Sequence, residues 1–565
     1  MAVPYAVSRG VSRGVPRSVT DRLFGGSTSA AALFLAQYGP YGMVMDFTDA
    51  SISINDETDV LDYNSQGTIS STTGLPLGPR SKLTYSAPSL KFTEQADGYI
   101  AGQAHNLYLN SAAPANQSIT VISGATYAVT ITGSVSVTAS GAATGTWTVG
   151  TNTFTAATGT LTLGSTSGSG TVHVRRTPSV PTYVATTGAV VYDLPYVFSG
   201  GVRTGIQVEA AATNSLTYSK AFTAGVSNWT LTGGTATSGG TSIFGDAAVK
   251  FEETAVTSEH TIYHASLTTT TATGWAIVEM AERRYVSLRH FSTAGNVVTV
   301  VFDLQDGVVT QTTNQGAVYS GVASSITPYT GGKYLISLTT TRSSGGTYFA
   351  INTNTTGTPT LSTSGSESFL GTAGSGVYLD FSQLETGTVV TSPIITYAVA
   401  VTRTVDLPYI PTNLFPSSIL TFSVYGNYVL PSPPRNYPCV FSVYQTSNTT
   451  GNRAQIYHAA SGTDYNSTFR VNASLGGTAV GVSVNPVFAP LTSIKAMIAV
   501  QAGSNAACIN GGTVATSTSS VVFADLDRLL IGQSGGAEQP NGLIKSIAYF
   551  PERKADATLQ TMTTA

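Results

Sequence analysis

Short runs of alternating apolar and polar residues, broken by Gly, Ser or Asn, place the tightest limit on how this chain can fold. The stretch 118–176 is an example, with segments such as "SITVIS", "YAVTIT" and "TFTAAT". A period of two puts every second side chain on one face of a β-strand. Short strands joined by such turns are typical of β-sandwiches. No helical pattern of 10–15 residues separates them, so the chain is predicted to be all-β, with β-sandwich (jelly-roll) modules in series and little helix.

The composition agrees with this fold class and excludes several functions. The chain has 565 residues, enough for three or four domains, yet only 10% of them are charged. A net charge of −3 gives no sign of nucleic-acid binding. No run approaches the ~18 apolar residues of a membrane helix. No signal peptide is recognisable, which predicts synthesis in a cytosol. Cys439 and Cys508 cannot form a disulfide framework, and their state stays open.

Changes in pattern along the chain predict five regions. The first is an extended N-terminal arm (1–42), in which Gly and Pro interrupt a basic pattern and the stretch 27–39 is the best helix candidate. Another short helix is predicted to start near Lys554. The arm is expected to order on docking to a partner through Arg9, Arg13, Arg17 and Arg22. The other four regions are a small β region (43–105), a small β-sandwich (106–198), a larger jelly roll (199–411) and a C-terminal sandwich (412–565).

One phrase, "DLPY", occurs twice, at 193–196 and at 406–409, each time between two predicted modules. Proline pushes the residue before it toward an extended conformation and cannot donate to a central β-ladder. The tyrosine that follows, Tyr196 or Tyr409, can pack on the next module. The phrase is therefore interpreted as a semi-rigid joint used twice.

The segments around these joints carry a resemblance to a known group of proteins. They resemble, in their order, the modular pattern of tailed-phage virion structural proteins of the fibre, spike or appendage type. In that pattern an opening segment leads into a carbohydrate-binding-module-like jelly roll that a "QLE-x-G" strand closes. The C-terminal region resembles a concanavalin-like or laminin-G-like sandwich. The segments are "AHNLYLNS" (104–111), "TNSLTYSKAF" (213–222), "VYLDFSQLETG" (377–387), "INGG" (509–512), "LLIG" (529–532) and "GLIKSIAYFPER" (542–553).

The resemblance implies a phage virion protein made in the host cytoplasm. It would dock to capsid, portal or tail proteins through its N-terminal arm and present lectin-like sandwiches to host-surface glycans. The resemblance also implies a homotrimer, in which several copies of a weak sugar-binding site act together and bind more strongly by avidity. Two alternatives stay open: a head fibre or capsid decoration protein with a purely architectural role, and a tailspike that depolymerises polysaccharide.

No catalytic or metal site is predicted from the residues, and no cofactor is expected. The densest acidic stretch, "NDETDVLD" (55–62), lacks the glycine and closing glutamate of a helix–loop–helix calcium site. His260 and His264 lie about 13 Å apart on a strand, too far to share a metal without other ligands. A structural calcium near Asp380 and Glu385, which the jelly-roll resemblance raises, is not claimed. The chain is therefore not expected to be an enzyme.

Glycan binding needs an aromatic platform and a few polar groups. Two tryptophans in the jelly-roll region are candidates for the platform, although tryptophan in such folds more often belongs to the core. The segment "SVYGNYVLPSPPRNYPC" (423–439) adds an irregular loop rich in tyrosine, for which simple packing is the alternative. The candidate glycan-binding residues are Trp229, Trp275, Tyr425, Tyr428, Arg435 and Tyr437.

Overall fold

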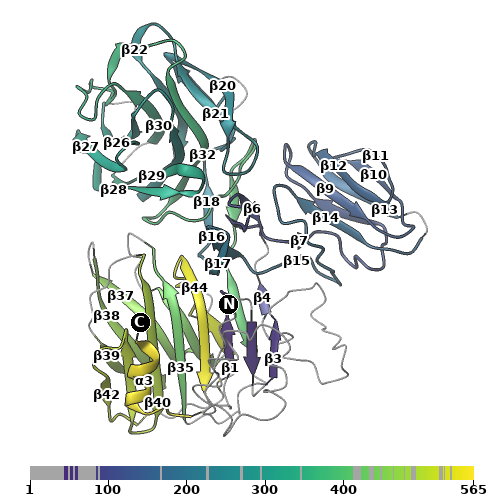
Figure 1. Ribbon diagram of the computed structural model, residues 1–565, viewed down its shortest axis with the longest axis vertical. Coiled ribbons are helices and arrows are strands. Elements are labelled where there is room, and N and C mark those ends of the chain that lie inside the picture. Colours follow the sequence, from purple (N-terminus) through teal and green to yellow (C-terminus); the bar gives the residue numbers. More distant parts are fainter. Residues whose placement is uncertain are drawn as a thin grey trace, which may run out of the picture. The chain divides into compact units, whose positions relative to one another are not determined.

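Strands make up nearly all of the secondary structure in the computed structural model, which confirms the all-β expectation (Figure 1). Contacts divide the chain into two compact units: Met1–Ser86, Arg203–Val208 and Leu407–Ala565 form the first, and Ala87–Val202 and Glu209–Asp406 the second. The structure describes residues 43–48, 51–54, 57–60, 84–86, 89–165, 168–223, 228–267, 271–292, 295–343, 347–411, 421–431, 438–445, 448–461, 464–475, 478–484, 491–520, 526, 528–534, 538–550 and 552–564.

The second unit begins with a hairpin and a small sandwich. One sheet has the order β11-β10-β13-β8 and the other β12-β9-β14. Alternate side chains of both sheets, such as Val137, Leu163 and Val129, meet in one buried core. The strands are β5 (Phe92–Glu94), β6 (Ile100–Gly102), β7 (His105–Asn106), β8 (Gln117–Thr120), β9 (Thr126–Ile131), β10 (Val137–Gly141), β11 (Gly145–Trp147), β12 (Gly150–Thr155), β13 (Thr160–Ser165), β14 (Val172–Arg176), β15 (Val191–Tyr192) and β16 (Tyr196–Ser199).

The larger module of this unit consists of two six-stranded antiparallel sheets, ordered β19-β23-β30-β25-β26-β27 and β20-β21-β32-β24-β29-β28. Their facing side chains form a buried core. The strands are β18 (Ala212–Asn214), β19 (Trp229–Thr232), β20 (Gly234–Thr241), β21 (Ala247–Glu253), β22 (Thr257–Glu259), β23 (Thr261–Leu267), β24 (Thr271–Met280), β25 (Tyr285–Phe291), β26 (Val297–Asp303), β27 (Val308–Gln315), β28 (Tyr319–Tyr329), β29 (Lys333–Arg342), β30 (Thr347–Asn354), β31 (Ser368–Leu370), β32 (Gly376–Thr386) and β33 (Val401–Arg403).

Both modules of this unit are closed by the same set of hydrogen bonds, which we call the clasp. In the small sandwich, the Asn106 amide donates to the Val184 carbonyl (2.8 Å), and its own oxygen accepts two backbone N–H groups at 3.0 Å. Ser111 and Thr186 bond reciprocally: the Thr186 N–H donates to the Ser111 hydroxyl oxygen (2.9 Å), and the Ser111 N–H donates to that of Thr186 (3.1 Å).

The clasp recurs in the jelly roll with the same residue types at the same short spacings. The Asn214 amide donates to the Ile394 carbonyl (3.0 Å), and its oxygen accepts two backbone N–H groups at 3.1 Å. The Thr396 N–H donates to the Ser219 hydroxyl oxygen (2.9 Å), and the Ser219 N–H donates to that of Thr396 (3.1 Å). Buried polar groups must be paired, so each clasp ties the opening of a module to the segment that leaves it.

The two "DLPY" phrases lie directly after these closures. The Asp193 N–H donates to the Ala104 carbonyl (2.8 Å), and the Asp406 N–H donates to the Glu209 carbonyl (3.0 Å). In both modules, therefore, the N–H of this aspartate bonds to a backbone carbonyl a few residues before the asparagine of the clasp. The "DLPY" motif therefore occurs twice because each copy follows a module that is closed by the same clasp.

The first unit contains the C-terminal sandwich. One sheet includes β3-β2-β1-β44-β35-β40-β41-β42, with β17 beside β44, and the other has the order β39-β38-β37-β36-β43-β34-β4. The strands are β1 (Met43–Asp46), β2 (Ser51–Ile54), β3 (Glu57–Val60), β4 (Thr84–Ser86), β17 (Val202–Val208), β34 (Leu407–Pro411), β35 (Thr421–Val429), β36 (Cys439–Gln445), β37 (Asn448–Ser461), β38 (Asp464–Leu475), β39 (Thr478–Val484), β40 (Ser493–Gln501), β41 (Asn505–Ile509), β42 (Ala515–Ser517), β43 (Arg528–Ile531) and β44 (Gly542–Phe550).

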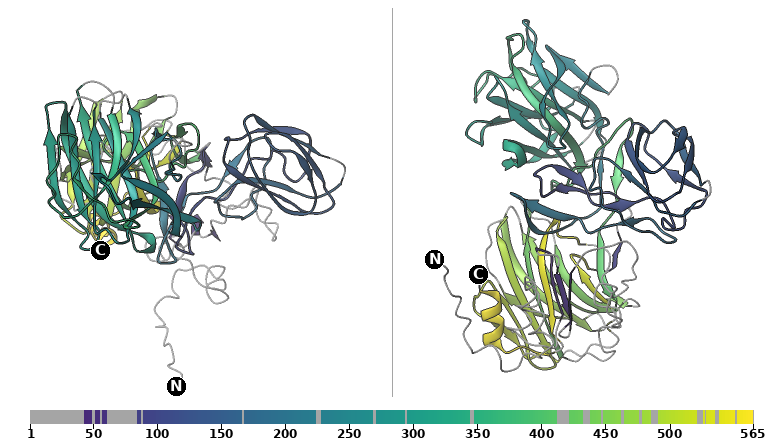
Figure 2. Two further views of the ribbon diagram at one scale, coloured as in Figure 1. Left: turned by 90° about the horizontal axis from the view of Figure 1, so that it is seen from above. Right: turned by 45° about the vertical axis from the view of Figure 1, so that its right-hand side comes forward.

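One sequence prediction changes in this unit, one is confirmed, and one concerns residues that the structure does not describe. The strands of 43–86 do not form a β region of their own over 43–105, because β1 pairs with β44 and β4 pairs with β34. The helix expected near Lys554 is present as α3 (Asp556–Thr563), which lies against β40 and β41 (Figure 2). The helix candidate at 27–39 lies outside the described residues.

Candidate ligand-binding site

The two candidate tryptophans are core residues, which corrects the prediction that they form a glycan platform. Trp229 is 2% exposed and packs on Phe222, with a ring-centroid distance of 5.1 Å. Trp275 is fully buried, and its indole N–H donates to the Glu385 carboxylate (2.9 Å). Trp229 faces the core between the two sheets, and Trp275 faces a second buried cluster that includes Phe92 and Phe381, so a sugar cannot reach either ring.

The two candidate tyrosines of β35 are also buried. Tyr425 belongs to the core cluster on which α3 packs, and the Tyr428 hydroxyl lies 2.7 Å from Nε2 of buried His458. The predicted irregular loop therefore begins later than expected, because 421–429 is a central strand. Arg435, Tyr437 and the arm residues Arg9, Arg13, Arg17 and Arg22 lie outside the described residues.

The carboxylates of β32 serve the interior of the jelly roll. Asp380 accepts the Ile243 N–H (2.7 Å), and Glu385 accepts the N–H and hydroxyl groups of Thr391 as well as the Trp275 indole. Burial raises the pKa of Asp380 to about 6 and also raises that of Glu385. Among the described residues, no group of three or more His, Cys, Asp or Glu side chains could hold a metal ion.

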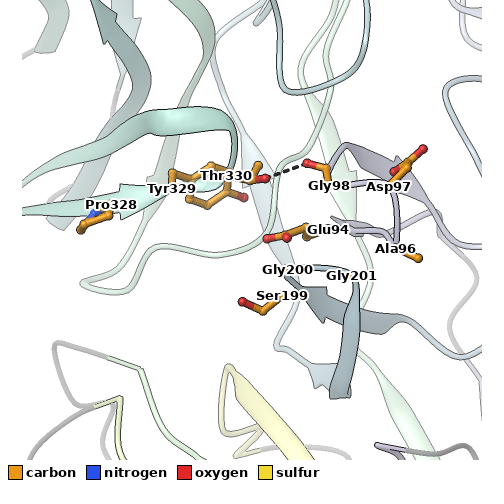
Figure 3. Close-up of a pocket in the computed structure, with 10 residues that line it drawn as sticks. All are labelled: Glu94, Ala96, Asp97, Gly98, Ser199, Gly200, Gly201, Pro328, Tyr329 and Thr330. Carbon is orange, nitrogen blue, oxygen red and sulfur yellow. Dashed lines mark hydrogen bonds between the residues drawn. The ribbon is translucent and has the colours of Figure 1, made fainter.

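A pocket of about 600 Å³ opens where three turns of the second unit meet (Figure 3). The first is the tip of the β5–β6 hairpin, the second follows β16, and the third joins β28 to β29. Ten described residues line the pocket: Glu94, Ala96, Asp97, Gly98, Ser199, Gly200, Gly201, Pro328, Tyr329 and Thr330.

Glycine makes these turns tight enough to converge. Gly98, Gly200 and Gly201 all have positive φ values, of 82°, 56° and 80°, a conformation that other residues adopt only with strain. The Thr330 hydroxyl donates to the Gly98 carbonyl (2.7 Å) and joins the β28–β29 turn to the β5–β6 hairpin. The pocket walls are therefore held by backbone geometry and by one bond between turns.

The electrostatic character of the pocket is acidic. Figure 3 shows the Glu94 and Tyr329 side chains extending toward one another from two sides of the pocket. Burial raises the pKa of Glu94, opposed by a backbone hydrogen bond from Gly200. Burial and the nearby Glu94 carboxylate raise the pKa of the Tyr329 phenol. The Asp97 carboxylate accepts only a local backbone bond, from the Tyr99 N–H (3.1 Å). None of the ten described lining residues is basic.

This set of groups suits a neutral polyhydroxyl ligand. Carboxylates are strong acceptors for hydroxyl donors, and the Ser199 and Thr330 hydroxyls can donate or accept. The Tyr329 ring and Pro328 offer an apolar surface for sugar C–H groups. None of these residues was predicted from the sequence. The sequence does show three glycine turns with polar or aromatic neighbours, "EQADGYI", "FSGG" and "TPYTGG", but nothing in it indicates that they meet.

Comparison with known proteins finds only distant similarity to solved structures. No protein-family model matches the chain, and no curated protein matches it. Among solved structures, it is similar to a carbohydrate-binding module (CBM40) of the IT-sialidase of Ruminococcus gnavus, bound to α2,3-sialyllactose. The identity is 13% and the TM-score 0.23, over 26% of this chain and 85% of that one.

Two further solved structures are similar to parts of this chain. Domain 4 of AbnA, an extracellular arabinanase of Geobacillus stearothermophilus in complex with arabinotriose, shares 16% identity (TM-score 0.24, 32% of this chain, 82% of that one). Domains LG4-5 of the mouse laminin α1 chain share 9% (TM-score 0.19, 50% and 81%). All three TM-scores are below 0.5, so these similarities carry no conclusion about this chain.

Proposed function

We propose that this chain is a glycan-binding protein without catalytic activity, and that the pocket lined by Glu94, Asp97 and Tyr329 holds a neutral sugar. The observation that carries the proposal is the pocket itself: two carboxylates, two hydroxyl side chains and a tyrosine ring around about 600 Å³, with no basic residue among those described. A sugar carboxylate or sulfate would meet like charge there, so neutral glycans are preferred.

Removing the ring of Tyr329 is the sharpest test of the pocket. We expect Tyr329→Ala to weaken binding of a neutral glycan by about tenfold or more, because an aromatic contact at the centre of a site carries much of its affinity. Glu94→Gln should weaken it on the order of fivefold, because a charge-assisted hydrogen bond becomes a neutral one. Titration calorimetry with the tightest-binding neutral glycan of an array gives the affinities.

Two variants act as controls for this test. Tyr329→Phe keeps the ring and should retain most of the affinity. Asp306→Asn removes an exposed carboxylate that pairs with Arg284, away from the pocket, and should leave the affinity unchanged. Unchanged binding in both Tyr329→Ala and Glu94→Gln would contradict the assignment of the sugar to this pocket.

The sequence resemblance extends the proposal to the setting of the protein. Its motif order supports a virion appendage of a tailed phage, with the basic arm around Arg9 and Arg22 docked to the particle and β-sandwiches presented to host-surface glycans. Weak single-site affinity would then be multiplied by several copies in a homotrimer.

Light scattering on the full-length protein and on a variant that lacks residues 1–40 tests this setting. We expect a trimer in both, because the arm is proposed to dock to the virion and the β modules are proposed to form the trimer contacts. A monomer in both preparations would contradict the trimeric appendage and favour subunits that assemble only on the particle.

A further inference from the structure

Residues 355–367, between β30 and β31, lie as a strap across the outward face of the sheet β19-β23-β30-β25-β26-β27. The Thr299 hydroxyl on β26 donates to the Gly365 carbonyl (2.7 Å), and the Arg289 guanidinium on β25 donates to the Ser364 carbonyl (2.5 Å). At Gly357 an added Cβ would lie 3.1 Å from the Tyr285 ring. The strap therefore covers the part of the face that β25 and β26 form.

On this outward face, three buried side chains contain polar atoms without a partner among the described residues. Arg289, Asn352 and Asn354 are each 1% exposed. The unpaired atoms are Nε of Arg289, Oδ1 of Asn352, and both Oδ1 and Nδ2 of Asn354. Alternation along β30 puts Asn352 and Asn354 on the same face, and pairing with β25 puts Asn352 beside Ser287 and Asn354 beside Tyr285.

This arrangement makes the closed strap a weakly held cover. A buried polar group without a hydrogen bond is strongly unfavourable, and here four such atoms lie on the face that this segment crosses. The strap itself, "TTGTPTLSTSGSE", offers only Pro359 and Leu361 as apolar side chains. Segments with few buried apolar contacts open most readily.

We infer that the strap opens as a unit and that the row formed by Arg289, Asn352 and Asn354 binds the hydroxyl groups of a saccharide chain. A carboxamide offers donors and an acceptor side by side, which matches neighbouring sugar hydroxyls. The same face continues to three partly exposed rings, Tyr263, Phe291 and Tyr348, with the Arg289 guanidinium 4.4 Å from the Phe291 centroid. This second, gated site rests on the proposed glycan-binding function but is separate from the pocket.

Hydrogen exchange of peptides from 355–367 in the full-length protein tests this inference, with hexasaccharides of glucose, mannose and galactose as separate probes. At least one probe should speed exchange of the strap, because it takes the strap's place on the sheet. The response should persist in Tyr329→Ala, because Tyr329 lies on β28, which is not part of the sheet that the strap crosses. The experiment therefore distinguishes a wrong assignment of the pocket from a wrong assignment of the gated site.

A single variant separates a binding role of Asn354 from a structural one. Asn354→Ala should slow exchange of the unliganded strap by about tenfold, because closure no longer buries an unpaired amide, and should abolish the response to saccharide. Asn314→Ala on neighbouring β27 is the control, because its amide is paired with the Tyr319 carbonyl (3.0 Å), and it should not slow exchange. Faster or unchanged exchange in Asn354→Ala, or no response to any of the three probes, would overturn the inference.

Discussion

Arg403→Ala is expected to lower the free energy of unfolding of the second unit by about 3–5 kcal/mol, because it leaves a buried carboxylate with one charge partner fewer. Arg403 is 1% exposed. Its guanidinium lies 3.2 Å from the Glu209 carboxylate and donates to the Ser392 hydroxyl (2.8 Å) and to the Ala210 carbonyl (3.1 Å). Removing it therefore disturbs the opening segment, the linker after β32 and the exit segment of the jelly roll together.

The charges around Arg403 explain why the loss should be large. Lys91 lies 3.3 Å from Glu209 and is bonded to Asp406, the aspartate of the second "DLPY". Burial alone would raise the pKa of Glu209, but Arg403 and Lys91 outweigh it and hold that pKa at about 2. Burial lowers the pKa of Lys91 to about 7. Two positive and two negative side chains thus pair with one another in a site that is buried from water.

Chemical denaturation followed by a probe of the second unit measures the effect. Lys250→Ala is the matched control, because Lys250 pairs with the partly exposed carboxylates of Glu252 (3.5 Å) and Glu282 (2.9 Å), and its loss should be far milder. Equal destabilisation by the two substitutions would contradict the importance assigned to the buried cluster.

Acidification is expected to produce the second large loss of stability, between pH 6.5 and about 3. Burial lowers the pKa of His105 and of His290 to about 3. In the unfolded chain both rings bind a proton below pH 6.5, whereas in the folded unit they stay neutral until far lower pH. The unfolded state therefore binds more protons across this window, and stability falls as pH falls. Each ring contributes about 1.4 kcal/mol per pH unit.

Burial keeps both rings neutral, and the bonds of His105 show which of its nitrogens carries the proton. His105 accepts the Arg176 N–H at Nε2 (2.9 Å), so Nδ1 carries the proton and donates to the Gln103 carbonyl (3.0 Å). His290 has Nδ1 2.8 Å from the Thr340 hydroxyl. Protonation would add a charge to the ring, and among the described residues neither ring is bonded to a carboxylate that could offset it.

Thermal unfolding measured at several pH values tests this account with one variant and one control. His290→Leu should flatten the dependence of stability on pH by about 1.4 kcal/mol per unit. Thr340→Ala removes the same hydrogen bond but keeps the titrating ring, so it should lower stability at every pH and leave the slope unchanged. An unchanged slope in His290→Leu would contradict a neutral buried histidine.

The fold class was predictable because it depends on local pattern. Alternation in "NVVTVVFDL" places Val298 and Val300 in the core, and the structure confirms a strand there, Val297–Asp303. The closing helix was predictable in the same way, from the end of the apolar alternation near Lys554. Partner strands far apart in sequence were not predictable, because nothing local at 43–46 indicates pairing with β44.

The candidate sites show why residue type alone misleads. Trp275 and Tyr428 are large aromatic residues, which favours a sugar platform, but such side chains also bury the most apolar area, and both lie in the core. The pocket depends on three turns that tertiary structure brings together, so Glu94 and Tyr329 carry no joint signal in the sequence. The clasp was predictable only in part. Its motif "AHNLYLNS" was recognisable in the sequence, but its bonding partners Val184 and Thr186 were not.

A glycan-array screen of the full-length protein at neutral pH, run beside Tyr329→Ala, tests the central claim most directly. The account predicts binding to neutral glycans that is strongly reduced in the variant, with no preference for sulfated or carboxylated ones. No binding to any glycan, or binding only to acidic glycans that the variant retains, would contradict glycan recognition by this pocket.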